Sequence, residues 1–303
     1  MRTFLSVLIC LFLSSAWSPA AEFDGVFVVF SADIAPYQQA FDGFKGAVQE
    51  RKGSLRIVEC DLEKEKADDI VQRIMKERPQ LVLAIGPEAA KFAKESISNT
   101  PVVYSMVFRP QSLAGANTTW VSMDIPPREK MERIRKIFPD AGKIGMIYSP
   151  GSAVLYREAV EGCTGLGLKV GGKEITSTIK LLTAFKDMAR QIDLFLMVPD
   201  TNIYSSESIK YLLAEALRNK VPVIGLAPAY TREGAILSFY ADYMDLGRQA
   251  GEMALRIIGG EKPQDIEPSQ PRKIKTSVNL AVAERLGIKI DPKVIEEASD
   301  VFK

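Results

Sequence analysis

The sequence contains one α/β pattern twice, and this repeat is the strongest constraint on the fold. The first copy covers residues 70–106 and the second covers residues 185–228. Each copy predicts an amphipathic helix, a short apolar strand ending in a turn, a second helix, and a second apolar strand introduced by a proline, Pro101 or Pro222. Two similar halves in one chain predict two lobes with a cleft between them.

Further apolar runs extend this pattern around both copies. A continuous apolar run is typical of a strand buried on both faces of a parallel sheet. These runs alternate with amphipathic segments, which indicates right-handed βαβ units. The sequence therefore predicts an α/β protein with two Rossmann-like lobes, each built on a parallel sheet. The expected strands are residues 25–30, 55–60, 81–85, 101–106, 144–148, 194–198, 221–226, 235–240 and 274–279, the last followed by a final helix at 280–286.

The turns that follow these strands are the predicted ligand site. In parallel α/β sheets, ligands bind beyond the carboxyl ends of the strands. The helix after each turn adds free N–H groups and the positive end of its dipole, which favours a carboxylate or another anion. Each serine at these positions could contact the ligand or could simply cap a helix. These serines are Ser31, Ser105, Ser149 and Ser152.

The absence of histidine and the balance of charges exclude several kinds of site. Without histidine there can be no Ser-His-Asp triad, no Cys-His pair and no histidine-ligated metal. The chain has 39 basic and 38 acidic residues, whereas a nucleic-acid-binding protein usually carries a basic excess. Catalysis by lysine, tyrosine or carboxylate groups stays possible, but the composition disfavours an enzyme. We expect no cofactor, no metal and no nucleic acid. Cys60 and Cys163 fall in different halves, so we expect two buried free thiols, although an exported protein could form a disulfide.

The N-terminal 20 residues have the form of a secretory signal peptide. Arg2 precedes an apolar stretch, residues 4–13, and the small-x-small sequence of a cleavage site ends at Ala20. The apolar stretch is short for a membrane span. We expect export with cleavage near Ala20, and the alternative is an uncleaved membrane anchor.

Motifs in the C-terminal half resemble a known family. Residues 242–251 (DYMDLGRQAG), 259–263 (GGEKP) and 278–290 (VNLAVAERLGIKI) resemble, in order and spacing, the ABC-transporter substrate-binding protein family whose studied members bind aromatic amino acids. The resemblance extends upstream to residues 199–202 (PDTN) and 101–110 (PVVYSMVFRP). It implies a type I periplasmic-binding-protein fold, a ligand between two lobes, a periplasmic location, an ABC permease as partner and no catalysis.

The resemblance also implies how the chain divides between the lobes. After the signal peptide, lobe 1 would comprise residues 21–122 and 236–262, and lobe 2 would comprise residues 123–235 and 263–303. Three segments then link the lobes and make a hinge with a defined bending axis. We expect a monomer that closes on its ligand.

Within the implied site, the resemblance points to the turn after residue 198. There Asp200 would bind a ligand ammonium group and Asn202 would orient the ligand, unless both cap the next helix. Gly86 follows the third predicted strand. Glu88, two residues further on, would either contact the ligand or stabilise the N-terminus of its helix through its negative charge. Tyr240, beside the implied hinge, is the strongest candidate for a stacking contact. Further aromatic candidates are Tyr37, Phe108, Trp120 and Tyr230.

The sequence departs from the family pattern near the expected cleft. Pro87 stands where the family usually has a threonine, and it removes an N–H that could face the ligand. Arg109 stands where the family usually has an aspartate, and residues 117–120 lack the usual glycine. Arg109 would either clamp a ligand carboxylate or lie exposed in its loop. If it clamps a carboxylate, the ligand is more anionic than a simple aromatic amino acid and Arg109→Ala weakens binding.

The sequence therefore predicts an exported receptor that captures an amino-acid-like molecule or a small carboxylate between two lobes and delivers it to an ABC permease. Two alternatives stay open. One is a ligand-sensing receptor of the same fold that signals to a membrane protein. The other is an exported enzyme that uses carboxylate or lysine chemistry in the cleft, which the absence of histidine disfavours.

Overall fold

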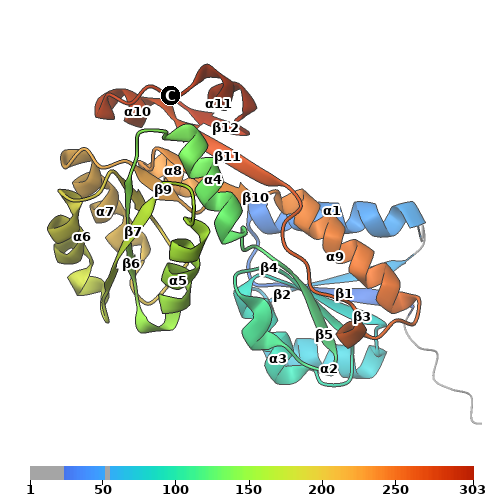
Figure 1. Ribbon diagram of the computed structural model, residues 1–303. Coiled ribbons are helices and arrows are strands. Elements are labelled where there is room, and N and C mark those ends of the chain that lie inside the picture. Colours follow the sequence, from blue (N-terminus) through green and yellow to red (C-terminus); the bar gives the residue numbers. More distant parts are fainter. Residues whose placement is uncertain (1–23, 52–54) are drawn as a thin grey trace, which may run out of the picture.

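The computed structural model describes residues 24–51 and 55–303, which form two α/β lobes side by side (Figure 1). The predicted signal peptide lies outside these residues. The sheet of the first lobe has five strands in the order β2-β1-β3-β4-β5, and all neighbours are parallel. Its strands are β1 (Gly25–Phe30), β2 (Arg56–Asp61), β3 (Leu81–Ile85), β4 (Val102–Val107) and β5 (Thr118–Ser122).

The sheet of the second lobe has seven strands in the order β12-β11-β10-β9-β8-β6-β7. β11 runs antiparallel to β10, and the other neighbours are parallel. The predicted class, an α/β fold with two parallel-rich sheets, is confirmed. The strands are β6 (Lys143–Tyr148), β7 (Lys169–Glu174), β8 (Leu194–Leu196), β9 (Val223–Gly225), β10 (Leu237–Ala241), β11 (Ile274–Asn279) and β12 (Asp300–Phe302).

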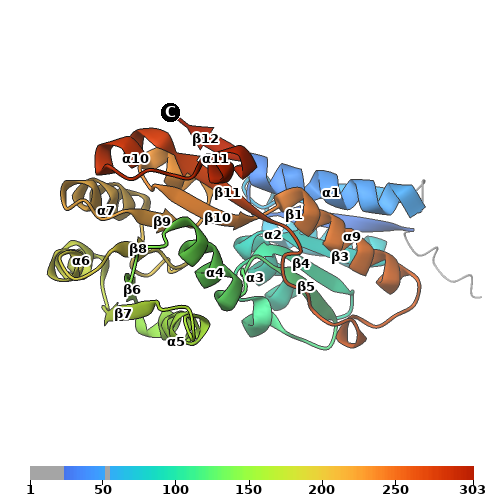
Figure 2. The ribbon, with the colours of Figure 1, turned by 45° about the horizontal axis from the view of Figure 1, so that its top comes forward.

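Helices cover both faces of the first sheet (Figures 1 and 2). Alternate residues of β1 point to opposite faces: Val28 packs in one core with α1 (Ala35–Arg51) and α9 (Tyr243–Ile258). Its neighbour Val29 packs in another core with α2 (Ala67–Glu77) and α3 (Pro87–Ser96). The helices of the second lobe are α4 (Pro127–Ile137), α5 (Ala153–Gly162), α6 (Leu181–Ala189), α7 (Ser206–Arg218), α8 (Pro228–Glu233), α10 (Leu280–Leu286) and α11 (Pro292–Glu297).

None of the helices in the described ranges has the length and apolar character that crossing a membrane requires. Cys60 and Cys163 are buried free thiols, as the sequence predicts. Burial raises the pKa of the Cys60 thiol to about 11, so this thiol is neutral at physiological pH.

Helices α1 and α9 pack with their backbones in close approach. A Cβ atom added to Gly247 would lie 1.6 Å from the carbonyl oxygen of Ala40, and one added to Gly43 would lie 1.9 Å from that of Met244. Both distances are far below van der Waals contact, so only glycine fits either position. Because α9 follows the second lobe's β10 in sequence, this contact ties a late segment of the chain to the first helix.

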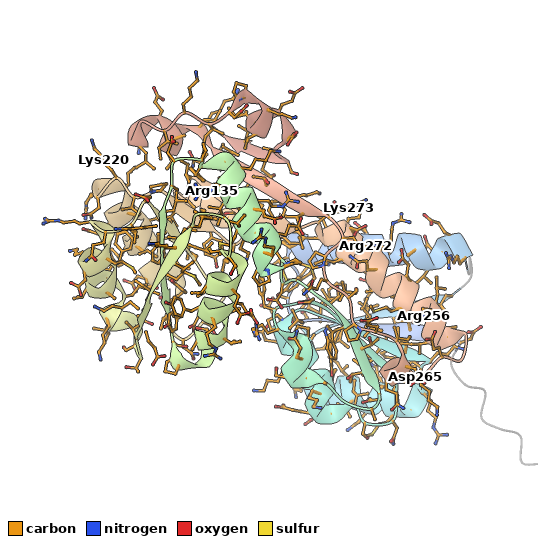
Figure 3. All side chains as sticks on the ribbon, in the orientation of Figure 1. Arg135, Lys220, Arg256, Asp265, Arg272 and Lys273 are labelled. Atoms are coloured by element: carbon orange, nitrogen blue, oxygen red, sulfur yellow. The ribbon has the colours of Figure 1, made fainter. Side chains whose placement is uncertain are left out.

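The chain passes between the two sheets three times. The first passage joins β5 to α4, the second joins β10 to α9 at Asp242, and the third leads into β11. The third passage runs beside the first, because the Ser122 N–H donates to the Ser269 carbonyl (2.9 Å). It is also held against α9: Figure 3 shows Arg272 next to this helix, where its guanidinium pairs with Glu252 at 2.9 Å. These passages are the three segments that the resemblance implies as a hinge.

Sheet membership differs from the lobe boundaries that the sequence suggested. β10 pairs with β9 and β11 in the second sheet, whereas residues from 236 onward were expected in the first lobe. Ile266 packs in the core of the first lobe, although residues from 263 onward were expected in the second. We propose that the lobes divide at Asp242 and after Ser269. The structure also contains three strands that the sequence analysis missed, β5, β7 and β12, so the helix at 280–286 is not the last element.

Candidate functional site

The carboxyl ends of β1, β3 and β4 bring together three predicted site residues, Ser31, Gly86 and Ser105. Ser31 Oγ accepts a hydrogen bond from the Ala89 N–H (2.9 Å) at the start of α3, and the Gly86 N–H donates to the Ser105 carbonyl (3.0 Å). Gly86 has φ +94°, and a Cβ there would lie 2.7 Å from the Tyr37 hydroxyl, so glycine is required. Within the described ranges, the buried Ser105 hydroxyl has no hydrogen-bond partner.

The carboxyl ends of β6 and β8 bring together the other predicted cluster, which is centred on Asp200. The Ser149 N–H donates to Asp200 Oδ2 (2.8 Å), and the Ser152 hydroxyl donates to the same oxygen. The Asn202 N–H donates to Asp200 Oδ1 (3.1 Å). Burial raises the pKa of the Asp200 carboxyl, but the hydrogen bonds from Ser152, Ser149 and Asn202 outweigh it. The pKa is therefore held below its ordinary value, and Asp200 is charged at neutral pH.

The capping alternative for Asp200 and Asn202 is wrong. Helix α7, the next helix, is capped by Ser205, whose side chain accepts from the Ser208 N–H (3.2 Å). The Ser208 side chain accepts in return from the Ser205 N–H (2.9 Å), which completes a capping box. Asp200 instead organises the turn in which it lies.

A cavity of about 140 Å³ lies at the hinge, with walls from both lobes. Phe108 and Arg109, which follow β4, form part of the first-lobe side. Pro199, next to Asp200, forms part of the second-lobe side, and Tyr240 lies at the hinge. Most of the remaining wall is apolar: Met123, Met131, Met146, Leu155, Leu196 and Phe239.

Arg109 joins the two lobes. Its Nη1 lies 3.1 and 3.2 Å from the two carboxylate oxygens of Glu158, which is on α5 of the second lobe. Its backbone is left-handed (φ +50°), and its N–H donates to Asp124 Oδ2 (2.7 Å) in the first passage. About a third of each paired side chain is exposed (37% and 33%), so solvent screens the ion pair. Arg109 therefore faces the cavity with a carboxylate partner already in place.

Tyr240 also lines the cavity, and its hydroxyl donates to Asp300 of β12. Burial and this hydrogen bond raise the pKa of Tyr240, so the phenol stays neutral. The Tyr243 ring lies 5.5 Å from that of Tyr240, centroid to centroid. Two other predicted residues lie apart from the cavity: Glu88 is exposed in the first turn of α3, and Trp120 packs against the core beneath α2 and α3.

The sequence analysis missed three charged residues of the cavity wall: Asp124, Lys130 and Glu158. Lys130 had a visible signal, because it precedes Met131 and lies four residues before Ile134, both of which are buried. A lysine beside the apolar stripe of α4 is positioned to face the interior of the protein. Glu158 had no such signal, because its partner Arg109 is 49 residues away.

Comparison with known proteins identifies the family. A family model described as ABC transporter substrate binding protein matches residues 34–302. The chain belongs to this family. Its members are extracytoplasmic binding proteins and not enzymes, so the predicted family and the predicted absence of catalysis are confirmed.

Individual relatives are more distant. The tyrosine-binding protein of Clostridioides difficile (strain R20291) is 26% identical over 209 residues, and the match covers 65% of this chain and 60% of that protein. A Streptococcus pneumonia ABC domain in complex with L-Trp superposes with a TM-score of 0.69 at 22% identity, covering 92% of this chain and 99% of that one. A ligand-free, open substrate-binding protein with adhesive properties from Clostridium difficile superposes with a TM-score of 0.77 at 19% identity, with the same coverage of both chains.

The fold is shared with more distant solved structures. A periplasmic ribose ABC transporter protein from Conexibacter woesei superposes with a TM-score of 0.58 at 15% identity, covering 89% of this chain and 96% of that one. The predicted type I periplasmic-binding-protein fold is therefore confirmed.

Proposed function

We propose that this substrate-binding protein is exported, binds an amino-acid-like ligand or a small carboxylate between its lobes, and delivers the ligand to an ABC permease. The observation that carries the proposal is a cavity with walls from both lobes. Each lobe also has a polar cluster at its strand ends, and in the second lobe Pro199 of the cavity wall is next to Asp200 of the cluster. Ligands of α/β sheets bind at such strand ends. The tyrosine-binding relative and the L-Trp complex support an aromatic amino acid as the first candidate ligand.

The two clusters suit the two ends of an amino acid. Asp200 Oδ2 accepts two hydrogen bonds but Oδ1 accepts one, and a carboxylate oxygen can accept about two. Oδ1 can therefore accept a further bond from a ligand ammonium group, with Asn202 beside it. In the first lobe, the start of α3 with Ser31 and Gly86 favours the ligand carboxylate, through the dipole and the amide of Glu88.

Hinge closure would bury the ligand between these clusters. Both clusters are built from turns that their own lobe holds by hydrogen bonds, so each moves as a rigid unit. A ligand that contacts both clusters stabilises the closed arrangement by the difference between its affinities for the closed and open forms. The closed arrangement would be the form that the permease recognises.

Ligand-dependent stabilisation tests this proposal. Residues 21–303, refolded from denaturant to remove any co-purified ligand, are melted with L-tyrosine, L-tryptophan, L-phenylalanine or small carboxylates, and with glucose as control. A ligand present at 100 times its dissociation constant should stabilise the folded protein by about 2.7 kcal/mol, which is a readily measured shift in melting temperature. If none of these amino acids or carboxylates shifts the melting temperature, the proposed ligand class is wrong.

A further inference from the structure

Lys130 differs from the other charged groups of the hinge cavity. Its side chain is half-buried in the cavity wall, on the first turn of α4. No hydrogen bond or ion pair joins it to any of the residues that the structure describes. A cation in a partly desolvated position is costly unless it is paired. The Lys130 amino group therefore has hydrogen-bond donors that no described residue accepts.

The nearby carboxylates accept hydrogen bonds from residues other than Lys130. Glu158 accepts hydrogen bonds from Arg109 at both of its oxygens, at 3.1 and 3.2 Å. Asp124 Oδ2 accepts from the Arg109 N–H (2.7 Å) and from the Ser122 hydroxyl (2.6 Å). Asp124 and Glu158 are near enough to favour the charged form of Lys130, but burial outweighs them and lowers its pKa. The hydrogen bonds of Lys130 are thus free for a ligand, and a ligand anion beside it would favour its charged form.

The size and wall of the cavity indicate what accompanies the anion. Its volume is about 140 Å³, and a cavity of about 150 Å³ can hold a benzene ring. Four of its wall residues are methionines: Met123, Met131, Met146 and Met197. Their thioether side chains adapt to the shape of an apolar group and contact aromatic rings favourably. The cavity therefore fits a ring or a short branched chain.

We propose that the hinge cavity receives the far end of the ligand side chain, and that Lys130 binds an acidic group there. This inference rests on the proposed function, because it assumes that the amino and carboxylate groups of the ligand occupy the strand-end clusters. It adds a preference: the favoured ligands carry an apolar body that ends in an anion. Arg109 has a supporting role, since its pair with Glu158 keeps that carboxylate away from the ligand anion.

Two matched probes test the preference on residues 21–303 by calorimetric titration. L-Phenylalanine has the ring alone, and 4-carboxy-L-phenylalanine adds an acidic group at the far end. We expect the acidic probe to bind at least tenfold more tightly, because a charge-assisted hydrogen bond to Lys130 forms in a partly desolvated site. In Lys130→Met, which keeps an unbranched apolar chain, the ratio of the two affinities should fall to about one.

Lys136→Met is the matched control. Lys136 lies on the same helix, its side chain is 66% exposed, and it pairs with Glu297 at 3.9 Å, away from the cavity. This variant should keep the wild-type ratio. The inference is overturned if the wild-type protein binds both probes equally, or if Lys130→Met keeps the preference for the acidic probe.

A second pair of probes separates this inference from the proposed function. Benzoate and benzyl alcohol lack the amino-acid groups, so they test the cavity alone. If benzoate binds, Lys130→Met abolishes its binding and no amino acid binds, Lys130 is an anion site in the cavity, but the amino-acid part of the proposed function is wrong. If L-phenylalanine binds but neither acidic probe shows a preference that depends on Lys130, the proposed function stands and this inference is wrong.

Discussion

Gly247→Ala should lower the stability of the protein by about 3 kcal/mol, the upper part of the range for overpacked interiors. The added Cβ would lie 1.6 Å from the Ala40 carbonyl oxygen, a backbone atom that cannot rotate away. Helices α1 and α9 would have to separate along their length, which would also loosen Leu246 and Ala250 in the core of the first lobe. The melting temperature should fall by roughly 6–12 °C.

Gly46→Ala is the control for this prediction. Gly46 lies on α1, but a Cβ there would have no neighbour within 4 Å. Because alanine has the higher helix propensity, this variant should be more stable than the wild type by up to about 1 kcal/mol. If Gly247→Ala lowers the stability and Gly46→Ala raises it, the α1–α9 contact needs glycine at Gly247. A Gly247→Ala protein that melts within about 2 °C of the wild type would contradict the close approach.

Asp200→Asn should destabilise the second lobe by about 2 kcal/mol at pH 7, a typical value for buried hydrogen bonds to a charged group. An asparagine has one oxygen, so its NH2 group would face either the Asn202 N–H or the Ser149 and Ser152 donors. At least one of these donors would then lose its partner. The same variant should bind the ligand more weakly, because the turn holds Asn202 in place. Urea unfolding and calorimetric titration measure the two effects.

The pH dependence of this destabilisation has a definite sign. The pKa of Asp200 is lower in the folded protein than its ordinary value, so the unfolded chain binds more protons. The stabilisation is therefore complete above the ordinary aspartate pKa of about 3.9 and is lost as the pH falls through the lowered value. The difference between wild type and variant should shrink on acidification in that range. Asp187→Asn, which removes an exposed ion pair to Lys173, should cost at most about 1 kcal/mol.

The doubled pattern was a reliable guide to the fold because local sequence determines it. Each copy became a helix, strand, helix and strand, α2-β3-α3-β4 and α6-β8-α7-β9. The missed strand β7 shows where local reasoning fails. Its sequence, KVGGKE, is mostly exposed and contains two glycines, and it forms a strand because β6 supplies hydrogen bonds along its whole length. A strand defined by its neighbour leaves little apolar pattern in the sequence.

The candidate site could be predicted where it depends on strand ends and not where it depends on contacts between lobes. Ser149, Ser152 and Asp200 follow two strands that neighbour each other in a parallel sheet, so their proximity follows from the topology. The ion pair of Arg109 and Glu158 depends on how the two lobes sit across the hinge, which no periodicity encodes. The assignment of β10 failed for a related reason: an apolar strand at a hinge can join either sheet, and its pairing with β11 decides the outcome.

The contact between α1 and α9 also governs the order in which the protein can fold during synthesis. One face of the first sheet is covered by α1 together with α9, and α9 begins only at Tyr243. When the ribosome has made only the first half of the chain, α9 does not yet exist. Apolar side chains such as Val28 and Leu83, which pack in one core with α9 in the finished protein, are then only partly buried. The lobe that emerges first is therefore completed late, after the strands β6 to β10 of the other lobe have been made.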